Sequence, residues 1–329
     1  MNRGNQILAA VLAVQLALIV AVFWPRSPSA AGGEPLLAGV EAAQIVRLTI
    51  ASQAVDGENV ESLEMAKSEE EWVLPTMGDY PCQPGAVPEL LDKIVALKGG
   101  KKVTETSESH KQLKVADQDF AHRVELVLED GSMHMLYLGT SPSYNAIHVR
   151  VGGQDEVYLA SGLSGTDVSA QPGAWIDTLY FTVPQDEIVA LALENANGRF
   201  EFVKNDDGQW IMPDRLADEE LDQANVTLLV SRVASVRMLR PLGKEAQIDY
   251  GMDVPQAVIT LQTVGAEGTT RTYELSVGAL RQEGGSVGYV FKSTESPYYV
   301  HVAEYTVQDW VEKTRDGFMV APPTPEPAS

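Results

Sequence analysis

Few side chains of this protein could do covalent chemistry, and the first candidate is its single cysteine, Cys82. A cysteine becomes a nucleophile when a neighbouring cation or a helix N-terminus lowers the pKa of its thiol. Cys82 instead follows Tyr80 and Pro81, so we expect a semi-buried small residue rather than a catalytic thiol. With one cysteine, neither an intrachain disulfide nor a thiolate zinc cluster can form.

The histidines do not follow the spacing of a metal site. They are His110, His122, His134, His148 and His301. None belongs to an HxH, HExxH or His-with-Cys pattern, which would place several ligands around one ion. In a hairpin with a two-residue loop, His134 would lie opposite Val127 and several positions away from His122. We therefore predict no metal site and no cofactor.

Three other patterns only imitate functional motifs. Asp206-Asp207-Gly208 and the acidic run Asp214–Asp222 lack the alternating oxygen ligands and final glutamate of a calcium loop, so we interpret them as a turn and a helix cap. Gly284-Gly285 lacks the lysine of a phosphate loop and is expected in a hairpin loop. Ser161–Gly165 lacks the Gly-x-Ser-x-Gly order of a nucleophile elbow. We predict no catalytic residue.

Aromatic side chains offer a different kind of site. Tyr144, Tyr289, Tyr298 and Tyr299 lie near the ends of predicted strands, where tyrosines can form a platform for a sugar or a peptide. Packing is the commoner role, because tyrosine is a standard strand former.

The charge of the chain excludes one class of partner. The 329 residues include 46 acidic and 24 basic side chains, a formal net charge of −22. Such a surface repels nucleic-acid phosphates and anionic lipid headgroups, so we predict no nucleic-acid binding. We interpret most of the excess as solvated surface, with a basic partner as the minor alternative. The length and the 44% of apolar residues are typical of two folded domains.

The N-terminus carries a predicted transmembrane anchor at residues 7–24. This run is apolar except for Gln15, and 18 helical residues reach roughly 27 Å, close to the hydrocarbon thickness of a bilayer. Arg3 within residues 1–6 favours a cytoplasmic N-terminus, although Arg26 on the far side weakens that preference. The body is then expected on the periplasmic or extracellular side of a bacterial inner membrane.

A cleaved signal peptide is the alternative reading, with Ser29-Ala30-Ala31 as the cleavage site. We favour the anchor because the apolar run is longer than a usual signal-peptide core and Pro25-Arg26 comes before the small residues. Residues 25–39 are predicted to be a linker, and residues 320–329 a disordered proline-rich tail.

Between these ends, apolar periodicity predicts mostly strands. A period of two over residues 46–50, 63–65 and 72–74 predicts a meander. Over residues 87–95 the apolar side chains recur with the period of an amphipathic helix, and Gly99-Gly100 is predicted to end that helix. Further strands are predicted at 123–128, 133–138, 147–151 and 157–159. Asp-Gly between the first two predicts a two-residue hairpin loop.

The second half repeats this order. Trp210-Ile211-Met212-Pro213 follows Trp72-Val73-Leu74-Pro75 by 138 residues, and Leu228-Leu229 follows Leu90-Leu91 by the same offset. Strands are predicted at 188–193, 200–203, near Trp210, and at 273–277, 289–292 and 299–302. A solenoid repeat is at most about 50 residues long, so this offset predicts a duplicated domain.

The tryptophans outside the anchor support two modules. Trp72 corresponds to Trp210, and this pair is expected to be a buried packing signature. Trp175 corresponds to Trp310, and each of these is expected to close its module by plugging one end of the core. We predict an α+β fold of two tandem duplicated modules, residues 40–182 and 183–319, behind the transmembrane helix. Each module has antiparallel strands and a short amphipathic helix.

The chain resembles the bacterial domain-of-unknown-function 4340 family over about residues 40–318. The resemblance rests on the two Trp-x-Leu/Met-Pro strands, on the amphipathic helix that follows each of them, and on the glycine-ended strands at Leu138-Gly139 and Leu275 to Gly278. That family has no assigned catalytic residues. The resemblance implies a membrane-anchored extracytoplasmic protein associated with ABC-type export systems.

Three functional hypotheses follow. The first is a non-enzymatic accessory protein that interacts with an ABC-type transporter complex. The second is a cell-envelope module that binds a glycan, a peptide or a cationic ligand. The least favoured is a hydrolase that uses Cys82 or a histidine.

Overall fold

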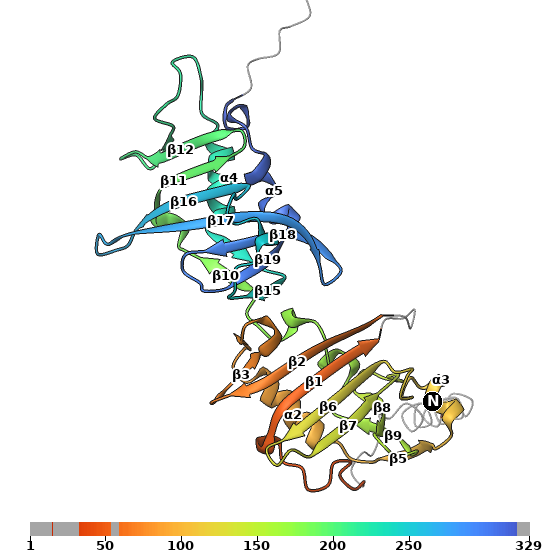
Figure 1. Cartoon of the computed structure of the whole chain (residues 1–329). Helices are drawn as coiled ribbons and strands as arrows, with labels where there is room; N and C mark the ends of the chain where they lie inside the picture. Colours follow the sequence, from red (N-terminus) through yellow and green to blue (C-terminus); the bar gives the residue numbers. More distant parts are fainter. Residues whose placement is uncertain (1–14, 16–32, 54–58, 321–329) are drawn as a thin grey trace, which may run out of the picture.

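The computed structural model describes residues 15, 33–53 and 59–320, in which two large antiparallel sheets follow each other along the chain (Figure 1). A two-stranded sheet of β10 (Leu179–Thr182) and β14 (Ser235–Arg237) accompanies the second of them. Strands dominate and helices are few, so the α+β class is confirmed. The predicted anchor at 7–24, apart from Gln15, lies outside the described residues, as does the tail after Val320. In the part of the chain that the structure describes, no helix has the length and apolar character needed to cross a membrane.

The first module, residues 33–178, is built on a nine-stranded sheet of order β4-β3-β2-β1-β6-β7-β8-β9-β5. Its strands are β1 (Ile45–Gln53), β2 (Val60–Ser68), β3 (Glu71–Leu74), β4 (Tyr80–Pro81), β5 (Lys101–Thr104), β6 (His122–Leu128), β7 (Met133–Leu138), β8 (Ala146–Val151) and β9 (Val157–Ser161). Its helices are α2 (Ala86–Val95) and α3 (Ser107–Gln112). The strands at the predicted positions are all present.

The second module, residues 179–320, is built on an eight-stranded sheet of order β13-β12-β11-β16-β17-β18-β19-β15. Its strands are β10 (Leu179–Thr182), β11 (Ile188–Asn195), β12 (Gly198–Lys204), β13 (Trp210–Ile211), β14 (Ser235–Arg237), β15 (Arg240–Gly243), β16 (Ala257–Val264), β17 (Thr270–Glu283), β18 (Ser286–Ser293) and β19 (Tyr299–Ala303). Its helices are α4 (Gln223–Val233) and α5 (Glu304–Glu312). With β4 set aside, the two sheets have the same strand order, each number in the second being ten higher.

The amphipathic helix predicted at residues 87–95 is α2. Val87, Leu90, Leu91 and Ile94 recur at helical spacing, and all four are buried in the core. Pro88 lies in the first turn, where the backbone N–H has no partner within the helix and its loss costs little. The helix therefore covers one face of the first sheet.

The loop between β6 and β7 is longer than predicted. Val127 pairs with Met133, and the Leu128 N–H donates to the Ser132 carbonyl at 3.0 Å, so three residues form the loop. Gly131 has a φ of 83°, the left-handed conformation that closes a three-residue loop. The prediction of a two-residue loop was wrong, and His134 lies opposite Leu126.

The folded body begins before residue 40, inside the predicted linker. The Leu36 N–H donates to the Leu97 carbonyl at 2.9 Å, and Leu37 is buried. At the other end of the first module, β10 pairs with β14, so residues 179–182 belong to the second module rather than the first.

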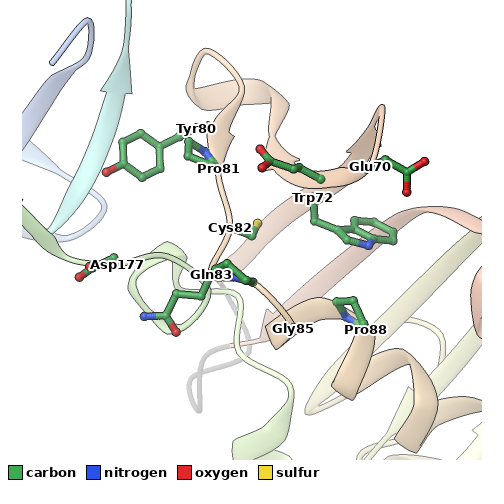
Figure 2. A pocket seen from close by; sticks show the side chains of 11 residues that line it. Glu70, Trp72, Tyr80, Pro81, Cys82, Gln83, Gly85, Pro88 and Asp177 are labelled. Carbon is green, nitrogen blue, oxygen red and sulfur yellow. The ribbon is translucent and has the colours of Figure 1, made fainter.

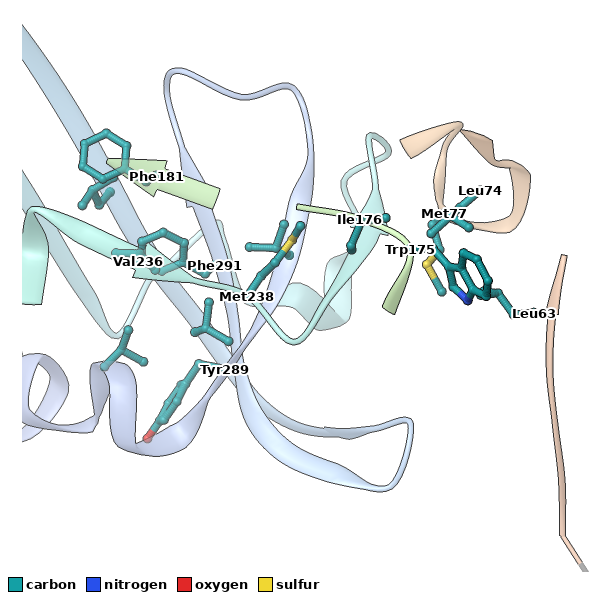
Figure 3. Close-up of a cluster of buried hydrophobic side chains, with 14 of the residues drawn as sticks. Leu63, Leu74, Met77, Trp175, Ile176, Phe181, Val236, Met238, Tyr289 and Phe291 are labelled. Atoms are coloured by element: carbon teal, nitrogen blue, oxygen red, sulfur yellow. The ribbon is translucent and has the colours of Figure 1, made fainter. Parts of the chain in front are cut away.

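The modules meet where β15 lies beside the turn after β3 (Figure 1). Gly78, in that turn, has a φ of 71°, and a Cβ there would lie 3.0 Å from the Gly243 Cα. Figure 3 shows the hydrophobic core continuing from Met77 past Trp175 and Ile176 to Met238. We call this contact region the joint.

Candidate functional site

A hollow of about 420 Å³ opens beside the edge of the first sheet, where β3, β4 and the start of α2 meet the chain just after Trp175 (Figure 2). Glu70, Glu71 and Trp72 line one part of it, and Tyr80, Cys82 and Asp177 another, with Pro81, Pro84 and Pro88 between them. We call it the Trp72 pocket. Its volume lies within the range of small-molecule and peptide side-chain sites.

Backbone hydrogen bonds fix the walls of this pocket. The Cys82 N–H donates to the Trp72 carbonyl at 2.8 Å, and the Gln83 N–H donates to the Trp175 carbonyl at 2.7 Å. The segment that carries Cys82 is therefore attached to β3 on one side and to the end of the module on the other. Such a wall is formed in advance of any ligand, which lowers the conformational cost of binding.

The two corresponding tryptophans have different environments. Trp210 is only 5% exposed. The side-chain amide of Gln223 accepts a hydrogen bond from the Trp210 backbone N–H and donates one to the Trp210 carbonyl. Trp72 is half-buried and lines an open pocket. The predicted burial is thus confirmed for Trp210, whereas Trp72 packs against the core but is only partly buried. The tetrapeptides are alike, and the difference lies in what packs over them.

The tryptophans at the C-terminal end of each module, Trp175 and Trp310, are buried as predicted. Trp310 is fully buried in α5, and Trp175 is buried next to the joint, where its indole N–H donates to the Ser169 carbonyl at 2.8 Å. Both indoles close the core of their module.

The lining of the Trp72 pocket is acidic. Glu70, Glu71 and Asp177 supply three carboxylates, and no lysine or arginine of the described residues lines it. Burial raises the pKa of Tyr80 to about 12, with Tyr180, Asp177 and Tyr298 adding smaller electrostatic contributions. The tyrosine hydroxyl is thus neutral at physiological pH, and the pocket has a net negative formal charge.

The prediction that Cys82 is semi-buried is confirmed. Burial raises the pKa of its thiol to about 11, so the thiol stays protonated at neutral pH. In the part of the chain that the structure describes, no histidine lines the pocket to act as its base. The side chain offers a small, soft apolar surface to a ligand rather than a nucleophile.

The family model described as Domain of unknown function (DUF4340) matches residues 72–247, more than half of the chain. The chain belongs to the DUF4340 family. The match begins at Trp72 and extends through Asp177 and the joint. No curated protein and no solved structure matches the chain.

The histidines of this DUF4340 protein are dispersed. His110 bonds through Nε2 to the Asp155 carbonyl at 2.7 Å, and His122 bonds through Nδ1 to the Ser52 hydroxyl at 2.9 Å. His301 is completely buried in β19. Over residues 33–53 and 59–320, no group of three or more histidine, cysteine or acidic side chains is placed to hold a metal ion.

The segments that resemble a calcium loop and a phosphate loop have the turn, helix-cap and hairpin structures predicted for them. Asp206-Asp207-Gly208 forms the turn between β12 and β13, closed by the Gly208 N–H donating to the Asn205 carbonyl. Asp222 is the N-cap of α4 and accepts from the Ala224 and Asn225 N–H groups at 2.9 and 3.1 Å. Gly284-Gly285 forms the tip of the hairpin between β17 and β18.

The tyrosines near the strand ends do not form one platform. The Tyr298 hydroxyl donates to the Asp79 carbonyl across the joint, and Tyr299 packs against Tyr250 with ring centroids 5.3 Å apart. Tyr289 is buried, and Tyr144, 93% exposed, stands alone. Sequence reasoning chose these side chains and passed over Trp72, whose exposure leaves no signal in the sequence.

Proposed function

We propose that this DUF4340 protein is a non-enzymatic binding protein of the cell envelope and that its ligand occupies the Trp72 pocket. One observation carries the proposal: of two tryptophans at corresponding strand positions, Trp210 is buried, whereas Trp72 is only partly buried and lines an open hollow. An indole packed into the core stabilises the fold, whereas one that faces a pocket offers apolar area and a π surface to a ligand.

The chemistry of the pocket supports binding over catalysis. Its thiol, on Cys82, and its phenol, on Tyr80, are held in the protonated form by raised pKa values, and its other side-chain polar groups include three carboxylates and an amide. Carboxylates can act as general bases, but the pocket pairs them with no nucleophile or histidine.

Binding arrays test the proposal. Full-length protein in detergent micelles would be applied to glycan and peptide arrays, next to the variants Trp72→Ala and Tyr144→Ala. We expect ligands that bind the wild type to be lost with Trp72→Ala and kept with Tyr144→Ala, which removes an exposed aromatic outside the pocket. Equal binding by all three proteins would contradict the proposal.

The second candidate concerns the partner. We propose that residues 7–24 anchor the protein in the bacterial inner membrane as a single pass, with the body outside the cytoplasm, and that it serves as an accessory of an ABC-type transporter. Membership of the family, whose members resemble partners of such export systems, supports this role. Affinity purification from solubilised membranes followed by mass spectrometry tests it. Recovery of no transporter component would count against it.

We also propose that the two modules arose by tandem duplication. The supporting observations are the shared strand order and the 138-residue offset between the two Trp-x-Leu/Met-Pro segments. The halves of other DUF4340 members should then align with each other at a similar offset. Halves that align no better than unrelated antiparallel sheets would contradict a duplication.

A further inference from the structure

A second hollow of about 340 Å³ lies on the other side of Trp72. Glu70, Trp72 and Pro88 line both hollows, so the indole and the proline form a ridge between them. The second hollow is otherwise lined by Ala42, Ala43, Ile45, Lys67, Leu91 and Asp92. We call it the Ile45 hollow, and the two together the Trp72 groove. A ligand long enough to cross the ridge could fill both.

The two ends of the groove differ in chemistry. Among the described residues, the Trp72 pocket has three carboxylates and no basic side chain. The Ile45 hollow has four aliphatic side chains, the cation of Lys67, and the carboxylates of Asp92 and the shared Glu70. Among the described residues, neither Glu70 nor Glu71 forms an ion pair, and Lys67 lines the Ile45 hollow but not the Trp72 pocket. Charge complementarity therefore places a cation in the Trp72 pocket and an apolar group in the Ile45 hollow.

The cation that fits best is a guanidinium. A planar guanidinium stacks on an indole and at the same time donates hydrogen bonds to carboxylates, which a compact ammonium does less well. Trp72 supplies the indole, and the carboxylates come from Glu70, in the turn before β3, and from Glu71, the first residue of β3. The thiol of Cys82 and the ring of Tyr80 add neutral surface for the methylene groups of an arginine side chain.

The arrangement of two hollows across one ridge matches an extended peptide. In an extended chain, side chains two positions apart project from the same side about 7 Å from each other. One can enter each hollow while the backbone passes over Trp72 and Pro88. Aromatic and proline ridges of this kind are a recurring way to bind extended segments.

We propose that the Trp72 groove binds an extended peptide segment, with an arginine side chain in the Trp72 pocket and an aliphatic side chain, two positions away, in the Ile45 hollow. This inference rests on the proposed binding function of the pocket and adds the class of its ligand. It also provides a basic partner segment for a strongly acidic protein.

The test uses fluorescein-labelled pentapeptides with arginine at one position, leucine two positions away and serine elsewhere. Fluorescence anisotropy would measure their binding to full-length protein in detergent micelles. In one variant peptide, citrulline replaces arginine, which keeps the shape and removes the charge. In another, serine replaces leucine. We expect citrulline to weaken binding at least tenfold and serine about threefold or more, and high salt to weaken only the arginine peptides.

Protein variants assign the effect to the groove. Glu70→Gln with Glu71→Gln should weaken the arginine peptide about fivefold or more and leave the citrulline peptide unchanged. Asp206→Asn with Asp207→Asn is the matched control, because it removes two exposed charges from the corresponding turn of the second sheet. It should leave binding of both peptides unchanged. Trp72→Phe should weaken both peptides, because phenylalanine is a smaller stacking surface.

The outcomes separate this inference from the proposed function. Equal affinity for the arginine and citrulline peptides would overturn the assignment of a cation. Binding of a glycan or of a small amine such as spermidine, lost with Trp72→Ala and without any peptide binding, would overturn the peptide class and keep the proposed binding function. Absence of every Trp72-dependent interaction would overturn both.

Discussion

Tyr298 of the second module packs edge-on against Tyr80 of the first, with ring centroids 4.6 Å apart and planes inclined by 63°. The Tyr298 hydroxyl donates a hydrogen bond of 2.9 Å to the Asp79 carbonyl, and Lys244 lies 5.0 Å from the centre of its ring. Because Tyr80 also lines the Trp72 pocket, one wall of the pocket is held in place by the neighbouring module.

The contribution of this contact can be divided between ring and hydroxyl. Tyr298→Phe removes only the hydrogen bond and should destabilise the protein by about 0.5–1.5 kcal/mol. Tyr298→Ala also removes the ring pair, which should cost a further 0.5–1.5 kcal/mol, roughly, beyond the lost apolar area. Differential scanning calorimetry measures both. Equal melting temperatures for the two variants would show that the ring contact is not stabilising.

The two tryptophans should respond differently to truncation. Trp210→Ala removes a buried indole and should cost about 3–5 kcal/mol, in the range of large core truncations. Trp72→Ala removes an indole that is only partly buried and should cost less. Urea unfolding followed by circular dichroism gives both values. A cost for Trp72→Ala as large as that for Trp210→Ala would mean that the pocket is closed in solution.

Cys82 should react slowly with alkylating reagents. With a thiol pKa of about 11, about one thousandth of the side chain is thiolate at pH 8, far less than for a free cysteine. The rate of iodoacetamide labelling, followed by mass spectrometry, should keep rising between pH 9 and about 11. Protein unfolded in urea is the control and should level off near pH 9. A native rate that levels off by pH 8 would contradict the effect of burial.

The same raised pKa affects stability at alkaline pH. The folded protein holds the Cys82 proton more tightly than the unfolded chain does. Its contribution is complete below the unfolded pKa near 9 and is lost as pH rises towards 11. Cys82→Ser should therefore lose less stability over that range than the wild type.

Arg315 should stabilise the segment before α4 in mild acid. Its Nε and Nη2 donate to the two oxygens of Glu219 at 3.0 and 2.8 Å, and its Nη1 donates to Asp214 at 2.9 Å. The hydrogen bonds from Arg315, followed by that from the Leu216 N–H, lower the pKa of Glu219 to about 2. The stability contributed by this carboxylate is present above pH 4.5 and is lost as pH falls towards 2.

Arg315→Ala should therefore reduce the pH dependence of the melting temperature between pH 4.5 and 2. Arg199→Ala is the control, since Arg199 pairs with Glu194 and Glu201 on the exposed side of β12. It should keep the acid dependence of the wild type. A wild-type slope in Arg315→Ala would show that the Glu219 carboxylate is not held by this arginine.

Local periodicity predicted the regular elements well. The alternation over residues 46–50 and the helical spacing from Val87 to Ile94 reflect which side chains must be buried, and that pattern is written in consecutive residues. Several short elements were missed, among them β4, β5 and α3, because two to six residues carry too little periodicity. The eight-residue interior strand β16 was also missed, although its buried positions alternate. The position of the hairpin at Gly131 was predicted correctly. The predicted length of its loop was wrong, because Asp-Gly suits both two-residue and three-residue loops.

The sequence by itself determined the family, the sheet-rich fold and the shared Trp-x-Leu/Met-Pro pattern, since these depend on local residue order. Only the tertiary structure decided that Trp72 faces a pocket while Trp210 is buried. Exposure depends on what distant segments place over a side chain. At Trp72 those segments are the start of α2 and the chain at Asp177, which leave a hollow instead of filling it.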